Sequence, residues 1–357
     1  MPAPRLNDLD APQKTWEQMH MTLLDRLPLP FWAIFAAILL LGVVSIGLEM
    51  VLEQRLATPG SQGQGDLTEA AATLLVVLYI LLHLRLIRQT ALRGLAQLRS
   101  AVKINDAVYD RYVTRMIRNN PRQEAGLLAL GVGLVVVLLV LPPDGVRRLP
   151  HQQPGEVVAI GVILLYYLVA FSTLLNLVYV GVRNSIALTA LSRQPLQVNV
   201  FDSAALLPFG RISLVQSLAF VGVFLIPLMI VGPPQAGGWL VIALSALSLV
   251  ALFVPLWGVH QQIVRERERV LGNICGELLH VQGALLSAPP AAVAEMKTLA
   301  DRTEVLLTFR KHILAGPSWP FRDFGAVIRA VAAAASPLIY LVLSQLVQTY
   351  LFPLFTQ

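Results

Sequence analysis

The sequence has little charge and almost no cysteine. Asp, Glu, Lys and Arg make up 13% of its 357 residues, about half their share in an average soluble domain, whereas hydrophobic residues make up 56%. A soluble core cannot bury that much apolar surface, so the composition excludes an ordinary soluble protein. The single cysteine, Cys275, excludes an intrachain disulfide, and we expect it to act as a small apolar residue.

Metal-binding and catalytic patterns are also missing from the sequence. Three histidines, His260, His280 and His312, share one segment with Cys275, but their spacing matches no standard zinc motif. The His-Glu-x-x-His pattern of zinc proteases does not occur. The sequence therefore predicts no metal site, no cofactor and no catalytic residue, and we expect a protein that is not an enzyme.

The chain does contain seven long apolar segments with very few charges. Each approaches the roughly 20 residues with which a helix crosses a bilayer, and none alternates polar and apolar residues with the period of two of a membrane strand. The sequence therefore predicts an all-α, polytopic membrane protein with seven transmembrane helices. The predicted spans are 31–52, 70–87, 125–141, 157–182, 212–231, 239–259 and 330–350.

The positive charges fall on one side of these spans. With the N-terminus inside, 24 of the 27 Lys and Arg residues lie on the cytoplasmic side, and only Arg55, Arg147 and Arg148 lie outside. Cytoplasmic loops of membrane proteins carry such an excess. We therefore expect insertion in the cell (inner) membrane with the N-terminus inside and the C-terminus outside. The net charge of +6 then faces anionic lipid, and nucleic acid is not expected as a partner.

Four regions follow from this topology. Residues 1–30 form a cytoplasmic N-terminal amphipathic segment, and 31–259 form a six-span transmembrane bundle. Apolar residues repeat at helical intervals over 88–118, which predicts that the second span continues into the cytoplasm as an amphipathic rod. In 260–316, apolar residues seven apart on either side of a Pro-Pro turn predict a cytoplasmic helical hairpin. Residues 317–357 supply an elbow and the last transmembrane helix.

The segment 195–211 is the least bilayer-like part of the chain. Val198 and Val200 alternate with polar neighbours, which predicts a short extended piece, and Asp202 or Ser203 can cap the helical turn that follows. Loops that pack against helix ends need such polar groups. We favour a structural role for this segment in closing the inner end of the bundle.

Polar residues concentrate in the last span. Ser336, Tyr340, Ser344 and Gln348 recur every four residues and, with Gln345, make one flank of the helix polar. Such a flank either packs against other helices through hydrogen bonds, which is the commoner use and the one we favour, or lines a water-filled path. These five residues are the candidate pathway-lining residues.

A short Pro-rich elbow precedes the last span. It contains Pro317, Trp319, Pro320, Phe321 and Arg322. Aromatic rings at headgroup depth beside a snorkelling arginine are typical of an interfacial anchor. The two prolines also make this elbow the natural hinge for any movement of the last helix.

Ionisable residues are nearly absent from the spans. Glu49 and His83 lie near the ends of the first two spans, where an interfacial or packing role is favoured over ion coupling. A coupled carrier generally has an intramembrane carboxylate or broken helices. A carrier built from this chain would use uncharged groups such as Ser172, Thr173 and Asn176.

Two resemblances bear on function. The stretch 195–211, with Trp257-Gly258-Val259-His260 and Trp319-Pro320-Phe321, resembles a group of prokaryotic multi-pass membrane proteins without an assigned activity. This likeness covers roughly the second half of the chain and implies no activity. Separately, seven spans with an internal N-terminus and a polar last span after a cytoplasmic hairpin are similar to the layout of insect odorant and gustatory receptors, which are tetrameric cation channels. That second likeness is one of topology alone.

We therefore expect an oligomeric integral membrane protein that is channel-like or ligand-sensing, with the last helix nearest the permeation pathway. Its partners would be the lipid bilayer and further copies of the same chain. One alternative is a non-conducting scaffold or signalling subunit that binds a cytoplasmic protein partner. The other is an uncoupled carrier of a small solute.

Overall fold

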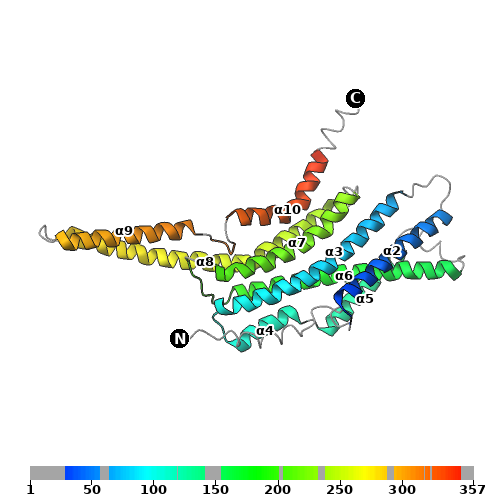
Figure 1. The fold of residues 1–357 in the computed structure, drawn as a ribbon, viewed down its shortest axis with the longest axis horizontal. Coiled ribbons are helices and arrows are strands. Elements are labelled where there is room, and N and C mark those ends of the chain that lie inside the picture. Colours follow the sequence, from blue (N-terminus) through cyan, green and yellow to red (C-terminus); the bar gives the residue numbers. More distant parts are fainter. Residues whose placement is uncertain are drawn as a thin grey trace, which may run out of the picture.

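The computed structural model describes residues 29–56, 64–118, 120–140, 154–200, 204–231, 238–287, 293–316, 318–321 and 324–346. Over these residues the fold is all-helical, as predicted, and extended pairing is limited to an isolated bridge between Val102 and Leu196. The α-helices, shown in Figure 1, are α2 (Phe31–Leu56), α3 (Gln64–Leu98), α4 (Asp106–Ile117), α5 (Pro121–Val140), α6 (Pro154–Ser192), α7 (Leu207–Ile230), α8 (Gly238–Ser287), α9 (Val293–Ala315) and α10 (Phe324–Leu346). Two short 3-10 turns, η2 (Arg99–Ala101) and η3 (Ala204–Leu206), connect them.

Five of the described helices are long and apolar enough to cross a membrane, which indicates a multi-pass membrane protein. The five candidate spans are Phe31–Leu52, Leu67–Ala101, Gly155–Ser192, Ala204–Ile230 and Ser245–Ser287. The two remaining predicted spans fall on α5 and α10, and their crossing of the bilayer stays a prediction.

Small buried clusters hold the long helices together. Ile80, Leu177 and Phe220 are almost fully buried where α3, α6 and α7 meet, and Ile38 and Val77 join α2 to α3. Other apolar side chains on these helices are exposed; Leu40, Val158 and Met229, for example, are 65%, 68% and 69% exposed. Apolar side chains on the outside of a bundle are costly in water and suited to lipid.

The largest buried cluster lies at one end of the bundle. It joins the last turns of α3 and α6, the first turns of α7, the middle of α8 and all of α4 through buried side chains such as Leu95, Leu188, Phe209, Leu256 and Tyr109. We call this the hairpin end, because α8 leaves the bundle here and continues outward beside α9.

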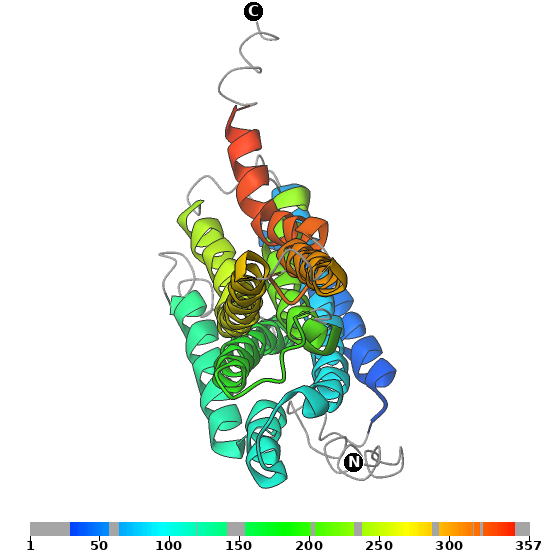
Figure 2. The same cartoon turned by 90° about the vertical axis from the view of Figure 1, so that its left-hand side faces the viewer.

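Helix α8 is 50 residues long and contributes to both the bundle and the hairpin. Its outer part lies alongside α9 and projects away from the other helices (Figure 1), and Figure 2 shows the assembly from that end. Val281 and Ile313 are buried between the two helices, and Glu277 of α8 forms an ion pair with Arg302 of α9 at 2.6 Å. The structure thus places two antiparallel helices over most of the segment in which the heptad spacing predicts a hairpin.

The predicted rod over 88–118 is interrupted. Helix α3 ends at Leu98, and η2 and an extended stretch lead into α4, which begins at Asp106. The Oδ1 atom of Asn105 accepts a hydrogen bond from the Ala107 backbone N–H at 3.1 Å, so this residue caps a new helix. The periodicity is helical on both sides of the break, which is why the sequence pattern predicts one continuous helix.

Candidate functional site at the hairpin end of the bundle

Segments that are far apart in the sequence meet at the hairpin end. They are residues 192–200, 208–210, 257–262 and 318–321, and we call this assembly the junction. It contains residues 195–200 and 208–210 of the first stretch on which the resemblance depends, and all of the other two stretches. Helix α8 passes through the junction on its way to the hairpin, and α10 begins just after the junction. The junction therefore lies between the hairpin and α10 (Figure 1).

The elbow packs on α8 through one aromatic stack. The rings of His260 and Trp319 lie 4.3 Å apart and 15° from parallel, and His260 Nδ1 donates a hydrogen bond to the Ser318 carbonyl oxygen at 2.7 Å. Phe253 and Trp257 add ring contacts to Trp319 at 5.8 Å and 6.3 Å. Aromatic pairs in such geometry contribute about 0.5–1.5 kcal/mol beyond their burial, so α8 holds the elbow firmly.

The elbow also packs on the first turn of α7. Gly210 faces the Pro320 carbonyl oxygen and the Phe321 ring so closely that a Cβ atom there would overlap the carbonyl oxygen. Pro320 and Phe321 are buried. Glycine is therefore required at position 210, because only a residue without a Cβ atom lets α7 approach the elbow this closely. This contact is a structural reason for the sequence Pro208-Phe209-Gly210.

Gln262 connects α8 to the segment that follows α6. Its Nε2 atom donates to the carbonyl oxygens of Ser192 and Gln194 at 2.7 Å and 2.8 Å, and its Oε1 atom accepts from the Leu196 backbone N–H at 3.1 Å. One amide side chain thus satisfies backbone groups that the end of α6 leaves without helical partners. Gly258, one turn earlier on α8, lies against Ser192 and leaves no room for a Cβ atom.

The same segment pairs with the turn after α3. The Lys103 backbone N–H donates to the Pro195 carbonyl oxygen at 2.9 Å, and the Gln197 N–H donates to the Ala101 carbonyl oxygen at 2.7 Å. These two bonds produce the bridge between Val102 and Leu196. The extended piece is therefore centred on Leu196, close to the predicted Val198 and Val200, whereas the predicted caps Asp202 and Ser203 lie outside the described residues.

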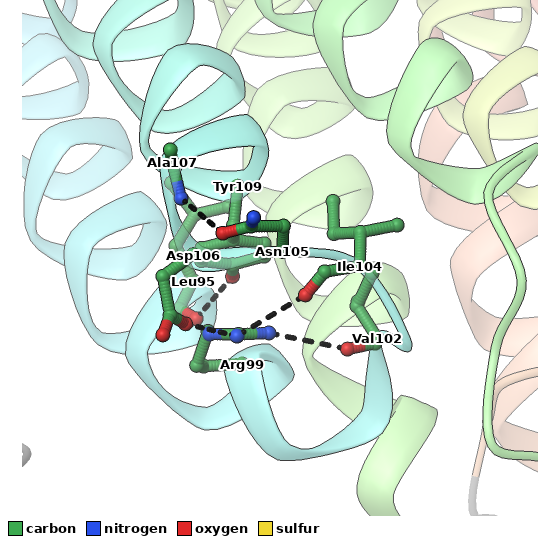
Figure 3. A network of polar contacts seen from close by, with 8 residues as sticks. All are labelled: Leu95, Arg99, Val102, Ile104, Asn105, Asp106, Ala107 and Tyr109. Carbon is green, nitrogen blue, oxygen red and sulfur yellow. Dashed lines mark hydrogen bonds and ion pairs between the residues drawn. The ribbon is translucent and has the colours of Figure 1, made fainter.

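Arg99 organises the turn between α3 and α4 (Figure 3). Its guanidinium donates to the carbonyl oxygens of Val102 and Ile104, both at 3.2 Å, and forms an ion pair with Asp106. It also lies 5.2 Å from the centre of the Tyr109 ring, a cation–π distance. These contacts explain why the chain turns here although its apolar period continues.

Tyr109 anchors α4 to α3 from within the buried cluster. Its hydroxyl group donates to the Leu95 carbonyl oxygen at 2.5 Å, and the side chain is fully buried. Burial raises the pKa of the Tyr109 phenol well above its usual range; the Arg99 charge lowers it in part, and Asp110 adds to the rise. The phenol therefore stays protonated and keeps its donor at every physiological pH.

The candidate pathway residues are only partly placed. Ser336 is half-buried and donates to the Ala333 carbonyl oxygen of its own helix at 2.8 Å, and Tyr340 is half-buried. The side chains of Ser344 and Gln345, and the whole of Gln348, lie outside the described residues, as do Pro317 and Arg322 of the elbow. Pathway lining by this flank, and the anchor and hinge roles of the elbow, stay predictions.

Other candidates lie away from the junction. Thr173 donates to the Val169 carbonyl oxygen at 2.6 Å, while the buried Ser172 Oγ and Asn176 Oδ1 atoms have no hydrogen-bond partner among the described residues. His83 Nδ1 donates to the Tyr79 carbonyl oxygen at 3.3 Å. His312 Nδ1 donates to the Thr308 carbonyl oxygen at 2.9 Å. Within the described part of the chain, no three His, Cys, Asp or Glu side chains form a group that could hold a metal ion.

Sequence reasoning missed Gln262, Arg99 and Tyr109 as organising residues. Gln262 carries a weak signal, because a glutamine in the middle of a long helix has no obvious local partner. Asn105-Asp106 carries a stronger one, since this pair is typical of a helix start.

Comparison with protein-family models, with curated proteins and with solved structures finds no significant match, so the geometry of the junction itself is the basis for assigning a function.

Proposed function

We propose that the chain is an oligomeric, channel-like or ligand-sensing membrane protein in which the cytoplasmic hairpin acts on the last helix through the junction. The observation that carries this proposal is the contact between the elbow and α8, in which Trp319 stacks on His260 and His260 donates a hydrogen bond to the Ser318 carbonyl oxygen. His260 belongs to the same continuous helix as the hairpin, and Trp319 lies just before α10. A displacement of the hairpin would therefore be passed to the start of the last helix.

The packing of α5 supports seven spans. Helices α3 and α6 both end in the buried cluster at the hairpin end, so the chain between them has to return to the far end of the bundle. Helix α5 lies antiparallel along α6, with Gln123 hydrogen-bonded to Tyr179 and Gly131 against Ser172 further along. Its 20 residues are enough for that return crossing.

The start of α10 supports the last crossing in the same way. Phe321 belongs to the cluster at the hairpin end, and α10 then leads away from that end past α7 and α8 (Figure 1). Helix α10 also changes direction along its length, and its sequence includes Pro337, which permits a kink. A bent last helix with a polar flank is consistent with a gated pathway.

Exposed apolar side chains on the hairpin support assembly with further copies. Leu279 and Leu286 of α8 are 69% and 82% exposed, and Val305, Leu307 and Phe309 of α9 are also exposed. Helices that show apolar side chains outside their mutual contact tend to bury them against another helix. Two hairpins packed together would form a four-helix bundle on the cytoplasmic side.

Ion flux into liposomes tests the proposal. The full chain, reconstituted with K⁺ or Na⁺ gradients, is expected to conduct, and Ser344→Leu and Gln348→Leu are expected to lower the flux several-fold by removing polar pathway groups. Val342→Leu, on the exposed side of the same helix, is the matched control and should leave flux unchanged. Trp319→Ala should change the flux without loss of the oligomer. Flux no greater than that of empty liposomes from an intact oligomer would contradict the proposal.

Two other functions have some support. The exposed hairpin also suits a non-conducting scaffold or signalling subunit that binds a cytoplasmic protein, and an intact oligomer without flux would favour it. The buried Ser172 and Asn176 oxygens, which lack partners among the described residues, suit an uncoupled carrier of a small solute. A monomer that exchanges solute would favour that function.

A further inference from the structure

A groove runs along the outside of the bundle between α6 and α8. Its membrane part has a volume of about 350 Å³ and a largely apolar lining that includes Val182, Ile186, Phe220, Val250 and Val254. Gly181 allows the Phe220 ring to pack closely against α6 at the base of the groove, because a Cβ atom at this position would overlap the ring. Val182, Ile186, Val250 and Val254 are exposed at its rim, so the groove opens sideways, toward lipid in a membrane.

At the hairpin end this groove opens into a larger polar basin of about 870 Å³. Thr189, Arg193 and Val254 line both parts, so the groove and the basin form one continuous channel on the surface of the bundle. Trp257 is 54% exposed and also lines the basin. Tryptophan at such a transition is typical of headgroup depth.

The basin carries excess positive charge. Arg193, Arg265 and Arg269 line it with a single carboxylate, Glu266, which forms an ion pair with Arg269 at 2.5 Å. Arg193 and Arg265 are exposed, and their guanidinium groups make no hydrogen bond or ion pair with the described residues. Two guanidinium groups are therefore available to bind an anion in bidentate fashion.

We propose that this channel binds one anionic phospholipid, with an acyl chain in the α6–α8 groove and its headgroup phosphate between Arg193 and Arg265. A free phosphate ion is excluded as the natural ligand, because it would occupy the basin alone and leave the apolar groove between α6 and α8 empty. The basic basin distinguishes the lipid from a zwitterionic one, whose choline or amine group would neutralise the phosphate. The Gln262 and Gly258 contacts place the basin on the junction itself, so a bound lipid would contact the elements that hold the hairpin.

Lipid titration by native mass spectrometry tests this inference on the full purified chain. After delipidation in detergent, the protein is titrated with phosphatidylglycerol or with phosphatidylcholine of the same acyl chains. We expect phosphatidylglycerol to bind roughly 30-fold more tightly, because two arginines near an anionic headgroup contribute about 1 kcal/mol each and about 1.4 kcal/mol corresponds to a factor of ten. Arg193→Gln/Arg265→Gln should abolish the preference for phosphatidylglycerol over phosphatidylcholine, and it changes no other exposed side chain.

Two further variants make the result specific. Arg310→Gln/Lys311→Gln removes two charges from the exposed face of α9 and should keep the preference. Ala190→Phe fills the groove from α6 and should weaken the binding of both lipids. Equal binding of the two lipids by the parent chain, or loss of the preference in the α9 variant, would overturn the inference. Displacement of phosphatidylglycerol by millimolar inorganic phosphate, with no effect of Ala190→Phe, would overturn it in favour of a phosphate site.

Discussion

Gln262 is the side chain on which the junction depends most directly. It forms three hydrogen bonds to the backbone of the segment after α6. A fully buried backbone group that loses its partner costs about 1–3 kcal/mol. The three groups bound by Gln262 are only partly buried and border the basin, so water can replace part of the lost bonding and the total cost stays at the low end. A single amide thus joins α8 to the end of α6.

Gln262→Leu is expected to lower the free energy of unfolding by roughly 2 kcal/mol, because leucine fills the space and forms none of these bonds. Thermal unfolding of the purified chain in detergent measures this change. Gln261→Ala, at the neighbouring exposed position, is the control and should leave the unfolding temperature nearly unchanged. Equal unfolding temperatures for the two variants would contradict this role of Gln262.

Tyr109→Phe is expected to cost about 1 kcal/mol, the usual value of one buried hydrogen bond, here the bond to the Leu95 carbonyl oxygen. The pH dependence gives a second readout. Because burial raises the pKa of Tyr109 in the folded protein, its contribution is complete below the unfolded pKa of about 10 and is lost as pH rises toward the folded value.

The fall in stability between pH 9 and pH 11 should therefore be smaller in Tyr109→Phe than in the parent chain. Thermal unfolding over this pH range measures it. Identical slopes for the two proteins would show that Tyr109 does not titrate in this way.

Among the elements, the hairpin makes the clearest prediction. Leu279→Gln/Leu286→Gln changes two exposed apolar side chains of α8 and should reduce the oligomer toward a monomer. The unfolding temperature should change little, since neither residue belongs to the buried contact with α9. Light scattering coupled to size-exclusion chromatography measures the mass.

Two controls frame that measurement. His280→Gln alters an exposed polar residue on the same helix and should keep the oligomer. Val281→Gln places an amide in the buried contact between α8 and α9 and should lower stability as well as mass. An oligomer that survives Leu279→Gln/Leu286→Gln would exclude this face as the assembly surface.

The elements were predictable from the sequence to the extent that length and period define them. Apolar runs near 20 residues predict long helices, and the structure has a helix over the described part of each run. The break between α3 and α4 was not predicted, because the apolar residues before and after it share one helical period. The reason for the break is the contact of Arg99 with two carbonyl oxygens and Asp106, and a period in the sequence carries no information on such contacts.

At the scale of the whole molecule, the sequence indicates which residues of the junction are unusual but not that they meet. The resemblance depends on 195–211, 257–260 and 319–321, and the structure brings the described residues 195–200 and 208–210 together with the other two segments. His260 and Ser318 are separated by 58 positions, and the packing of α7, α8 and the elbow determines their contact. No spacing rule for single helices predicts such a meeting.

At the same scale, we propose that the basic hairpin end faces the cytoplasm and that α10 crosses to the other side of the membrane, and the proposed function depends on this sidedness. Cys275 offers a direct test, because it is the single cysteine of the chain and is exposed on the hairpin. A membrane-impermeant maleimide should label it in inverted vesicles and not in intact cells. In Cys275→Ser/Gln357→Cys the pattern should reverse. Labelling of both positions from the same side would contradict the account, because the hairpin and the C-terminus would then share one compartment.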